Sequence, residues 1–230
     1  MVFSKTSFVS PLRRPEIYVP GLALLPAMLI YFAVQGWHMA NRKALQQMPP
    51  VSTYYDEVKT KLQNGDLVFR QGYGFFTRLV LWMDPGAVYS HVGIVVKQGN
   101  DFYIVHALSE EALQQSSRVT KVPLEHFIKP ENARSFAFAR VQTTEKLRKL
   151  AAKHACTYYR NFSTYDLAFD LGSPDALYCS ELIWRAYMKV GVDLMNNNFD
   201  KLWILGGGKL IKPESLLESR YTMLLKSYPE

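Results

Sequence analysis

The sequence contains few of the residues that build metal sites and disulfide frameworks. It has two cysteines, Cys156 and Cys179, among 230 residues, and no CxxC, HExxH or Cys/His quartet. These absences leave a metal site unsupported. Because a chain of this length buries a core without a covalent staple, we expect both thiols to stay free.

Dense basic blocks and nucleotide-binding loops are missing as well. The net charge is +7, but lysine and arginine are spread along the chain. This pattern favours a surface near anionic lipid and excludes a nucleic-acid partner. The glycines at 206–208 lack the strand and helix that flank a phosphate loop. We therefore expect no cofactor.

Charge is absent from residues 17–37, IYVPGLALLPAMLIYFAVQGW. As a helix this segment would be about 31 Å long, which matches the hydrocarbon core of a bilayer. Tyr18, Tyr31 and Trp37 lie near its ends, as interfacial aromatic residues do. The segment predicts a single-pass membrane anchor. A cleaved signal peptide and a buried core helix are the alternatives, but the run is long for the first and lies outside the recognisable domain.

The anchor divides the chain into a tail at 1–16, the transmembrane segment at 17–37, a linker at 38–60 and a domain at 61–230. Basic residues flank the anchor on both sides, with a small excess before it. This bias favours a cytoplasmic N-terminus and a domain on the periplasmic side of a bacterial inner membrane.

The domain alternates strand and helix signals without an internal repeat. Turn residues at 98–101 predict a hairpin, and a strand or edge with a short helix is expected at 119–128. Other strands are predicted at 67–69, 90–96, 102–108 and 136–141, and helices at 54–62, 75–83, 143–155 and 179–190. The apolar helix at 75–83 fits a core position better than a lipid-facing groove.

A histidine and a cysteine are the candidate catalytic residues of the domain. Cys179 is expected at the first position of a helix, where free N–H groups and the helix dipole stabilise a thiolate. His91 begins an apolar strand. Taken singly, each is more often a structural residue. Together they are the two parts that a thiol nucleophile needs.

The hairpin register brings a second histidine to the first. If the turn is centred at Gly99-Asn100, cross-strand partners sum to 199, so His91 faces Leu108 and His106 faces Gly93. His91 and His106 then share a face and lie diagonally, roughly 5–8 Å apart. His106 is therefore the candidate that orients the His91 imidazole, with Glu110 and Glu111 as alternatives.

Four segments carry a family resemblance: GDLVF at 65–69, SHVGIVV at 90–96, Val105-His106-Ala107, and YDLAFDLGSPDALYCSELIWRAY at 165–187. They resemble the YiiX/YebB-like cysteine hydrolases, a circularly permuted branch of the NlpC-type papain-fold superfamily, related to the lecithin retinol acyltransferase-like proteins. The resemblance covers about residues 61–220. It implies an α+β fold in which an antiparallel sheet packs on helices.

The resemblance also implies roles for residues. Cys179 would be the nucleophile, His91 the general base and His106 the third polar residue, at a position where YiiX-like proteins often hold glutamate. The reaction implied is attack on an amide, ester or thioester through an acyl-enzyme, without metal or cofactor. A cell-wall peptide or an acyl lipid at the bilayer is the expected substrate. The alternative is a catalytically silent binding module that keeps the fold.

Overall fold

The computed structural model describes residues 51–230 except 85, 108–117, 174, 202–207, 229 and 230. The described residues belong to one compact unit. Its elements, in chain order, are α2 (Val51–Lys59), β1 (Leu67–Gln71), α3 (Phe75–Met83), β2 (His91–Gln98), β3 (Asp101–Ala107), β4 (Val119–Pro123), α4 (Leu124–Ile128), β5 (Ser135–Val141), α5 (Glu145–Arg160), α6 (Cys179–Met188), β6 (Asp200–Lys201), β7 (Lys209–Leu210), α7 (Pro213–Leu217) and β8 (Thr222–Tyr228).

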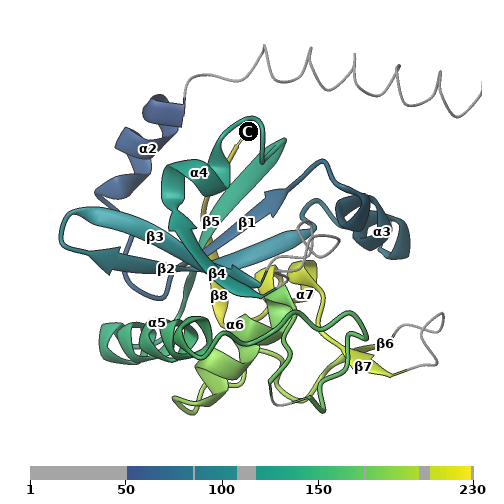
Figure 1. Ribbon diagram of the computed structural model, residues 1–230. Coiled ribbons are helices and arrows are strands. Elements are labelled where there is room, and N and C mark those ends of the chain that lie inside the picture. The colour runs from purple at the N-terminus through teal and green to yellow at the C-terminus, as the bar shows by residue number, and fades with distance from the viewer. Residues whose placement is uncertain (1–50, 85, 108–117, 174, 202–207, 229–230) are drawn as a thin grey trace, which may run out of the picture. The chain divides into compact units, whose positions relative to one another are not determined.

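One antiparallel sheet organises the unit, with strand order β4-β3-β2-β1-β5-β8. Helices α5 and α6 lie on one face, and α2 and α4 lie on the other (Figure 1). Alternate strand residues feed two separate cores: Val92 and Ile94 pack on the α5/α6 face, whereas Val95 and Ile104 pack on the α2/α4 face. The α+β architecture predicted from the sequence is therefore confirmed.

The β2–β3 hairpin has the predicted register. Gln98 pairs with Asp101 and Ile94 pairs with Val105, so partners sum to 199. Gly93 explains how two histidines fit beside each other. A Cβ atom there would lie 2.3 Å from the Ile104 side chain and 3.2 Å from the His106 Cβ. The missing side chain therefore leaves room for His106 on this face.

The Gly-Asp pair before β1 ties the sheet to its helices. Gly65 has a φ of 87°, and a Cβ there would lie 2.4 Å from the Arg148 carbonyl oxygen of α5. The fully buried Asp66 carboxylate accepts two hydrogen bonds from Arg140 of β5, at 2.8 and 2.7 Å. The Tyr187 hydroxyl of α6 donates to the Gly65 carbonyl at 2.6 Å. These residues have a structural role that the sequence pattern did not reveal.

Helix α2 lies inside the segment that was interpreted as linker. Val58 is 4% exposed and packs with Leu62 in the α2/α4 core, and the Tyr228 hydroxyl donates to Glu57. The helix is amphipathic, so it buries one face against the sheet. Residues 51–59 are thus packed as part of the compact unit. Strand β8, which pairs with β5 at the sheet edge, was not predicted.

The predicted anchor at 17–37 lies outside the described residues. Within the part of the chain that the structure describes, no helix has both the length and the apolarity that crossing a bilayer requires.

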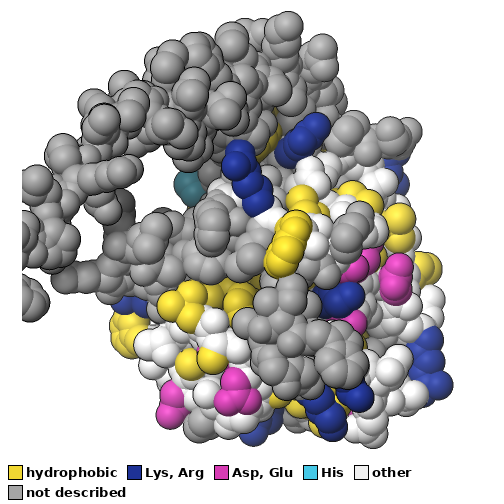
Figure 2. All heavy atoms as spheres, turned by 90° about the vertical axis from the view of Figure 1, so that its right-hand side faces the viewer, with side chains coloured by type: hydrophobic (Ala, Val, Ile, Leu, Met, Phe, Trp, Pro, Cys, Tyr) yellow, Lys and Arg dark blue, Asp and Glu magenta, His cyan; other side chains and the backbone are white. Residues whose placement is uncertain are grey.

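Trp82 of α3 is 64% exposed and Val88 is 49% exposed. The prediction that α3 belongs to the core is therefore wrong at Trp82. Hydrophobic and basic side chains are interspersed on the face that Figure 2 shows.

Candidate active site

Cys179 is the first residue of α6, as predicted. Tyr178 precedes it as the N-cap in an extended conformation. The Cys179 side chain is 7% exposed and packs in the α5/α6 core with Val92. Its sulfur lies 3.8 Å from the Ser180 hydroxyl oxygen. Both cysteines of the chain are free.

The electrostatics of the thiol differ from the expectation. Burial raises the pKa of the Cys179 thiol above its ordinary value. The Ser180 hydroxyl and the backbone N–H groups of Val92, Ser180 and Cys179 lower it, but they do not offset burial. The helix terminus by itself favours a thiolate, but desolvation penalises the charged form and has the larger effect here. At rest, Cys179 is therefore a thiol.

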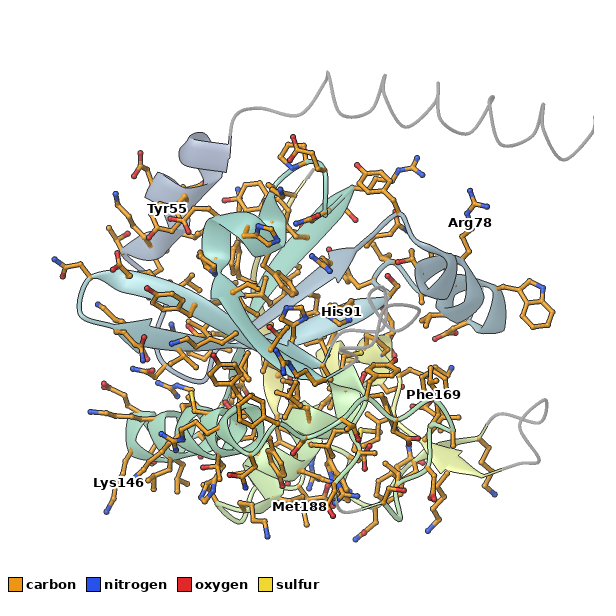
Figure 3. The ribbon with its side chains drawn as sticks, viewed as in Figure 1. Tyr55, Arg78, His91, Lys146, Phe169 and Met188 are labelled. Atoms are coloured by element: carbon orange, nitrogen blue, oxygen red, sulfur yellow. The ribbon has the colours of Figure 1, made fainter. Side chains whose placement is uncertain are left out.

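His91 and His106 lie together, as the register predicted. His91 Nε2 is 2.9 Å from His106 Nδ1, and the ring centroids are 5.0 Å apart at 84°. His91 is labelled in Figure 3, where β2 begins. Both rings contact Phe127 of α4, His91 by stacking at 5.7 Å and His106 edge-on at 5.0 Å. The pair is therefore fixed from two strands and one helix.

The hydrogen bond between the rings limits the useful tautomer. For His91 Nδ1 to accept a proton, His91 must carry hydrogen on Nε2 and donate it to His106 Nδ1. His106 then carries its hydrogen on Nε2. That atom is buried and has no hydrogen-bond partner among the residues that the structure describes. Glu110 and Glu111, the alternative orienting residues, lie outside the described residues.

The environment opposes a charge on either ring. The pKa of His91 is lowered well below its ordinary value by burial, then by Arg70 and His106. The pKa of His106 is lowered by burial, then by Arg70 and His126. Both imidazoles are therefore neutral near pH 7.

The nucleophile and the histidine pair approach β2 from different sides. Cys179 packs on the α5/α6 face, whereas Phe127, which holds the imidazoles, belongs to the α2/α4 core. The two groups meet at the first residues of β2, because the Val92 N–H faces the sulfur and Val92 follows His91. In the described structure, no hydrogen bond joins the Cys179 sulfur to the His91 imidazole.

A C-terminal segment holds both parts of the site. The Ile211 N–H donates to the Tyr178 hydroxyl at 2.9 Å, next to Cys179. Three residues on, in α7, the Glu214 carboxylate accepts the N–H groups of Val88 and Tyr89, at 3.2 and 3.3 Å. These residues belong to the loop that leads into His91. Sequence reasoning missed this contact because it joins positions about 125 residues apart.

Two further polar groups support the motifs around the site. The Ser90 hydroxyl donates to Thr77 of α3 at 3.0 Å, which fixes the residue before His91. Glu181 is fully buried and paired with Arg185 at 2.7 Å. Arg185 also donates to the carbonyls of Leu171 and Ser173, so it ties the preceding loop to α6. Burial raises the pKa of Glu181 to about 7, against the opposing effect of Arg185.

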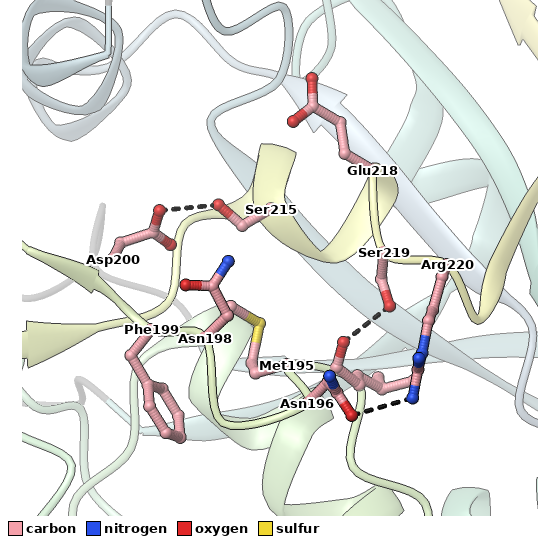
Figure 4. Close-up of a pocket in the computed structure, with 10 residues that line it drawn as sticks. Met195, Asn196, Asn198, Phe199, Asp200, Ser215, Glu218, Ser219 and Arg220 are labelled. Atoms are coloured by element: carbon pink, nitrogen blue, oxygen red, sulfur yellow. Dashed lines mark hydrogen bonds between the residues drawn. The ribbon is translucent and has the colours of Figure 1, made fainter.

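A pocket of about 430 Å³ lies elsewhere, between the segment after α6 and α7 (Figure 4). Hydrogen bonds join Ser215 to Asp200 and Arg220 to Asn196 across it. Neither Cys179 nor the histidine pair lines this pocket. It is therefore separate from the candidate active site.

The fold and the order of the residues define a class: a papain-like fold in permuted order, with the histidine strand before the cysteine helix. A family model described as permuted papain-like amidase enzyme, YaeF/YiiX, C92 family, matches residues 61–216. Because the match spans more than half of the chain, the protein belongs to this family. Membership supports a hydrolase of the cysteine amidase or peptidase type.

A solved structure agrees with the fold. The crystal structure of metalloprotein yiiX from Escherichia coli O157:H7 has a TM-score of 0.59 and 18% identity, covering 71% of this chain and 96% of that chain. No curated protein matches the chain. Among the residues described for this chain, no group of three or more His, Cys, Asp or Glu side chains is placed to hold a metal ion.

Proposed function

We propose that the protein is a membrane-anchored cysteine amidase in which Cys179 is the nucleophile, His91 the general base and His106 the residue that orients it. The observation that carries the proposal is the 2.9 Å hydrogen bond between His91 and His106. His91 is the first residue of β2, and this end of the strand lies next to the start of α6, where Cys179 is placed. The hydrogen bond leaves His91 Nδ1 to serve the thiol. The family match supports amide hydrolysis.

The reaction proceeds in two halves. His91 Nδ1 takes the proton of the Cys179 thiol as sulfur bonds to the carbonyl carbon, and the π electrons move to oxygen. The backbone N–H of Cys179 stabilises this oxyanion. When the C–N bond breaks, the amine leaves with the proton from His91. Water then attacks the thioester, His91 takes its proton, and the acid leaves as sulfur is reprotonated.

Proton transfer accompanies attack in this proposal, because the resting site is uncharged. The thiol pKa is raised and both imidazole pKa values are lowered, so the neutral pair is favoured over a thiolate–imidazolium pair. The reaction also needs the His91 imidazole and the Cys179 sulfur to come into hydrogen-bond contact around Val92. We assign this approach of the imidazole to the sulfur to the step in which substrate binds at the end of β2.

We propose that the N-terminal segment anchors the protein in a lipid bilayer. The uncharged residues 17–37 and the net charge of +7 support single-pass anchoring near anionic lipid. The exposed Trp82 and Val88 are consistent with a domain that works close to the bilayer. Deletion of 17–37 should release the protein from the membrane fraction. A full-length protein that fractionates as soluble would contradict this assignment.

Substrate and nucleophile are tested together with the full-length protein in lipid nanodiscs. Peptide amides from cell walls and acyl lipids are offered, and covalent adducts are located by mass spectrometry. We expect a hydroxylamine-sensitive thioester on Cys179, and loss of turnover by roughly a thousandfold or more in Cys179→Ala. Cys156→Ala, the matched control in α5, should keep full turnover.

The opposite results have clear meanings. An adduct on Cys156, or turnover that survives Cys179→Ala, would refute the assignment of the nucleophile. Absence of both adduct and turnover with every amide, ester and thioester would favour the silent binding module. Turnover of acyl lipids with transfer to an acceptor other than water would replace hydrolysis by acyl transfer through the same intermediate.

A further inference from the structure

A buried cation lies beside the two histidines. Arg70 of β1 is 5% exposed and is the cross-strand partner of His91. Directly paired residues in an antiparallel sheet share a face, with Cβ atoms roughly 5 Å apart. The Arg70 side chain is therefore held on the same face as both imidazoles.

Phe127 links the cation to the imidazoles. The Arg70 guanidinium carbon lies 4.4 Å from the Phe127 ring centroid, and Nη1 donates to the Phe127 carbonyl at 3.1 Å. The same ring contacts His91 and His106. One aromatic side chain of α4 thus fixes the guanidinium and the histidine pair in a single buried cluster.

We propose that Arg70 is a positioning residue of the active site, whose buried charge acts together with burial to keep the His91–His106 pair neutral in the resting enzyme. The inference rests on the proposed role of the pair as base. A second positive charge on either ring would be buried close to the guanidinium, where like charges repel strongly. The base therefore stays in its proton-accepting form at mildly acidic pH. Once protonated, it readily returns the proton to the leaving amine.

Further titratable groups near the pair lie on α4 and α6. His126 of α4 acts on His106 in the same direction as Arg70, and the Cys179 thiol faces β2 from α6. Burial is the largest cause of the lowered pKa of both histidines, and Arg70 is the next. Removal of the Arg70 charge should therefore raise the pKa of the pair without bringing it fully to the ordinary value.

The test measures protonation directly, so it does not depend on turnover. Full-length protein with isotope-labelled histidine rings is titrated by NMR as wild type, Arg70→Met and Arg70→Lys, with His154 of α5 as the internal reference. In the wild type we expect the pair to remain neutral well below pH 6.5. In Arg70→Met the first protonation should move up by roughly one pH unit or more. Arg70→Lys keeps the charge and should stay near the wild type.

Three results would overturn the inference. One is protonation of the wild-type pair at an ordinary histidine pKa, which needs no variant and so remains decisive if Arg70→Met does not fold. The second is an equal titration of Arg70→Met and the wild type. The third is an equal shift in Arg70→Met and Arg70→Lys, which would indicate a packing role. If Cys179 forms no acyl-enzyme but the titrations behave as expected, the proposed function fails and the role of Arg70 in the pair stands.

Discussion

The nucleophile side and the base side of the site both disfavour charge, but for different reasons. Around Cys179, burial raises the thiol pKa while hydrogen-bond donors act against it. Around His91, burial and the Arg70 charge lower the imidazole pKa together. Each side also holds an arginine, which is half-buried in the case of Arg185 and buried in the case of Arg70. Arg185 is paired with a carboxylate, whereas Arg70 lies over an aromatic ring.

This difference shows which side of the site controls the rate and its pH dependence. On the nucleophile side, hydrogen-bond donors already surround the sulfur, so the negative charge that develops on it as the proton leaves is stabilised at once. On the base side, the added charge of an imidazolium meets Arg70 and a neutral His106. The base side therefore limits how long a proton stays on His91, and changes there should alter rate and pH dependence most.

Among variants that keep both Cys179 and His91, the largest effect is expected from removal of the orienting ring. His106→Ala deletes the acceptor for His91 Nε2–H and leaves that donor unpaired in a buried site. We expect acylation of Cys179 to slow by roughly 100-fold near pH 7.5, because a misoriented base transfers protons poorly. His106→Gln, whose side-chain oxygen is an acceptor, should recover part of the rate. The acylation rates of both variants are measured with an activated ester, by following release of its leaving group.

An equal rate in wild type and His106→Ala would place the orienting role elsewhere. His154→Ala is the matched control, since His154 lies on α5 and takes no part in the ring-to-ring hydrogen bond. Its acylation rate should be close to that of the wild type.

The buried carboxylate beside the nucleophile makes stability depend on pH. Glu181 has a pKa of about 7 in the folded protein and 4.5 as its ordinary value, so the folded state binds the extra proton between these values. Its contribution to stability is complete below about pH 4.5 and is lost as pH rises to about 7. Glu181→Gln should remove this loss, on the order of 1–3 kcal/mol.

Chemical denaturation at several pH values between 4.5 and 7.5 checks this prediction. The quantity compared is the difference in unfolding free energy between Glu181→Gln and wild type. This comparison is needed because the histidine pair has the opposite sign: its lowered pKa makes wild-type stability fall as pH drops below about 6.5. If the unfolding free energies of Glu181→Gln and wild type changed in parallel with pH, the raised pKa of Glu181 would be contradicted.

The smallest effect is expected from the C-terminal contact that serves both sides. Glu214→Ala removes the acceptor for the Val88 and Tyr89 N–H groups before His91. A displaced loop should slow acylation by roughly tenfold or less, since the base itself remains. Glu218→Ala, just beyond the same helix, is the control and should leave the rate unchanged. Equal rates in all three proteins would show that the contact is not needed.

Much of the fold could be predicted because its signals are local. Alternation, turn residues and apolar periodicity indicated β2, β3, β5 and α5, and the side chain of Thr144 caps α5 by accepting the Leu147 N–H. The hairpin register then placed His106 beside His91. Strand β8 was missed because its exposed and buried residues do not alternate, and a register shift at Phe138/Ala139 interrupts its pairing with β5.

The site was less predictable where it depends on burial and distant contacts. The sequence indicated Cys179 at a helix start but not the burial that raises its pKa. Arg70 reads as an ordinary strand residue, and only the position of Phe127, 57 residues away, shows that its charge is buried next to the imidazoles. The Glu214 contact likewise depends on tertiary structure alone.

Single-turnover acylation of Cys179 by an activated ester, in full-length wild type and His91→Ala at pH 7.5, tests the central claim most directly. If His91 is the general base, the rate should fall by roughly 100- to 10,000-fold in His91→Ala, while the Cys179 thioester still forms slowly. An unchanged rate of thioester formation would contradict the account, because the thiol would then lose its proton without the histidine pair.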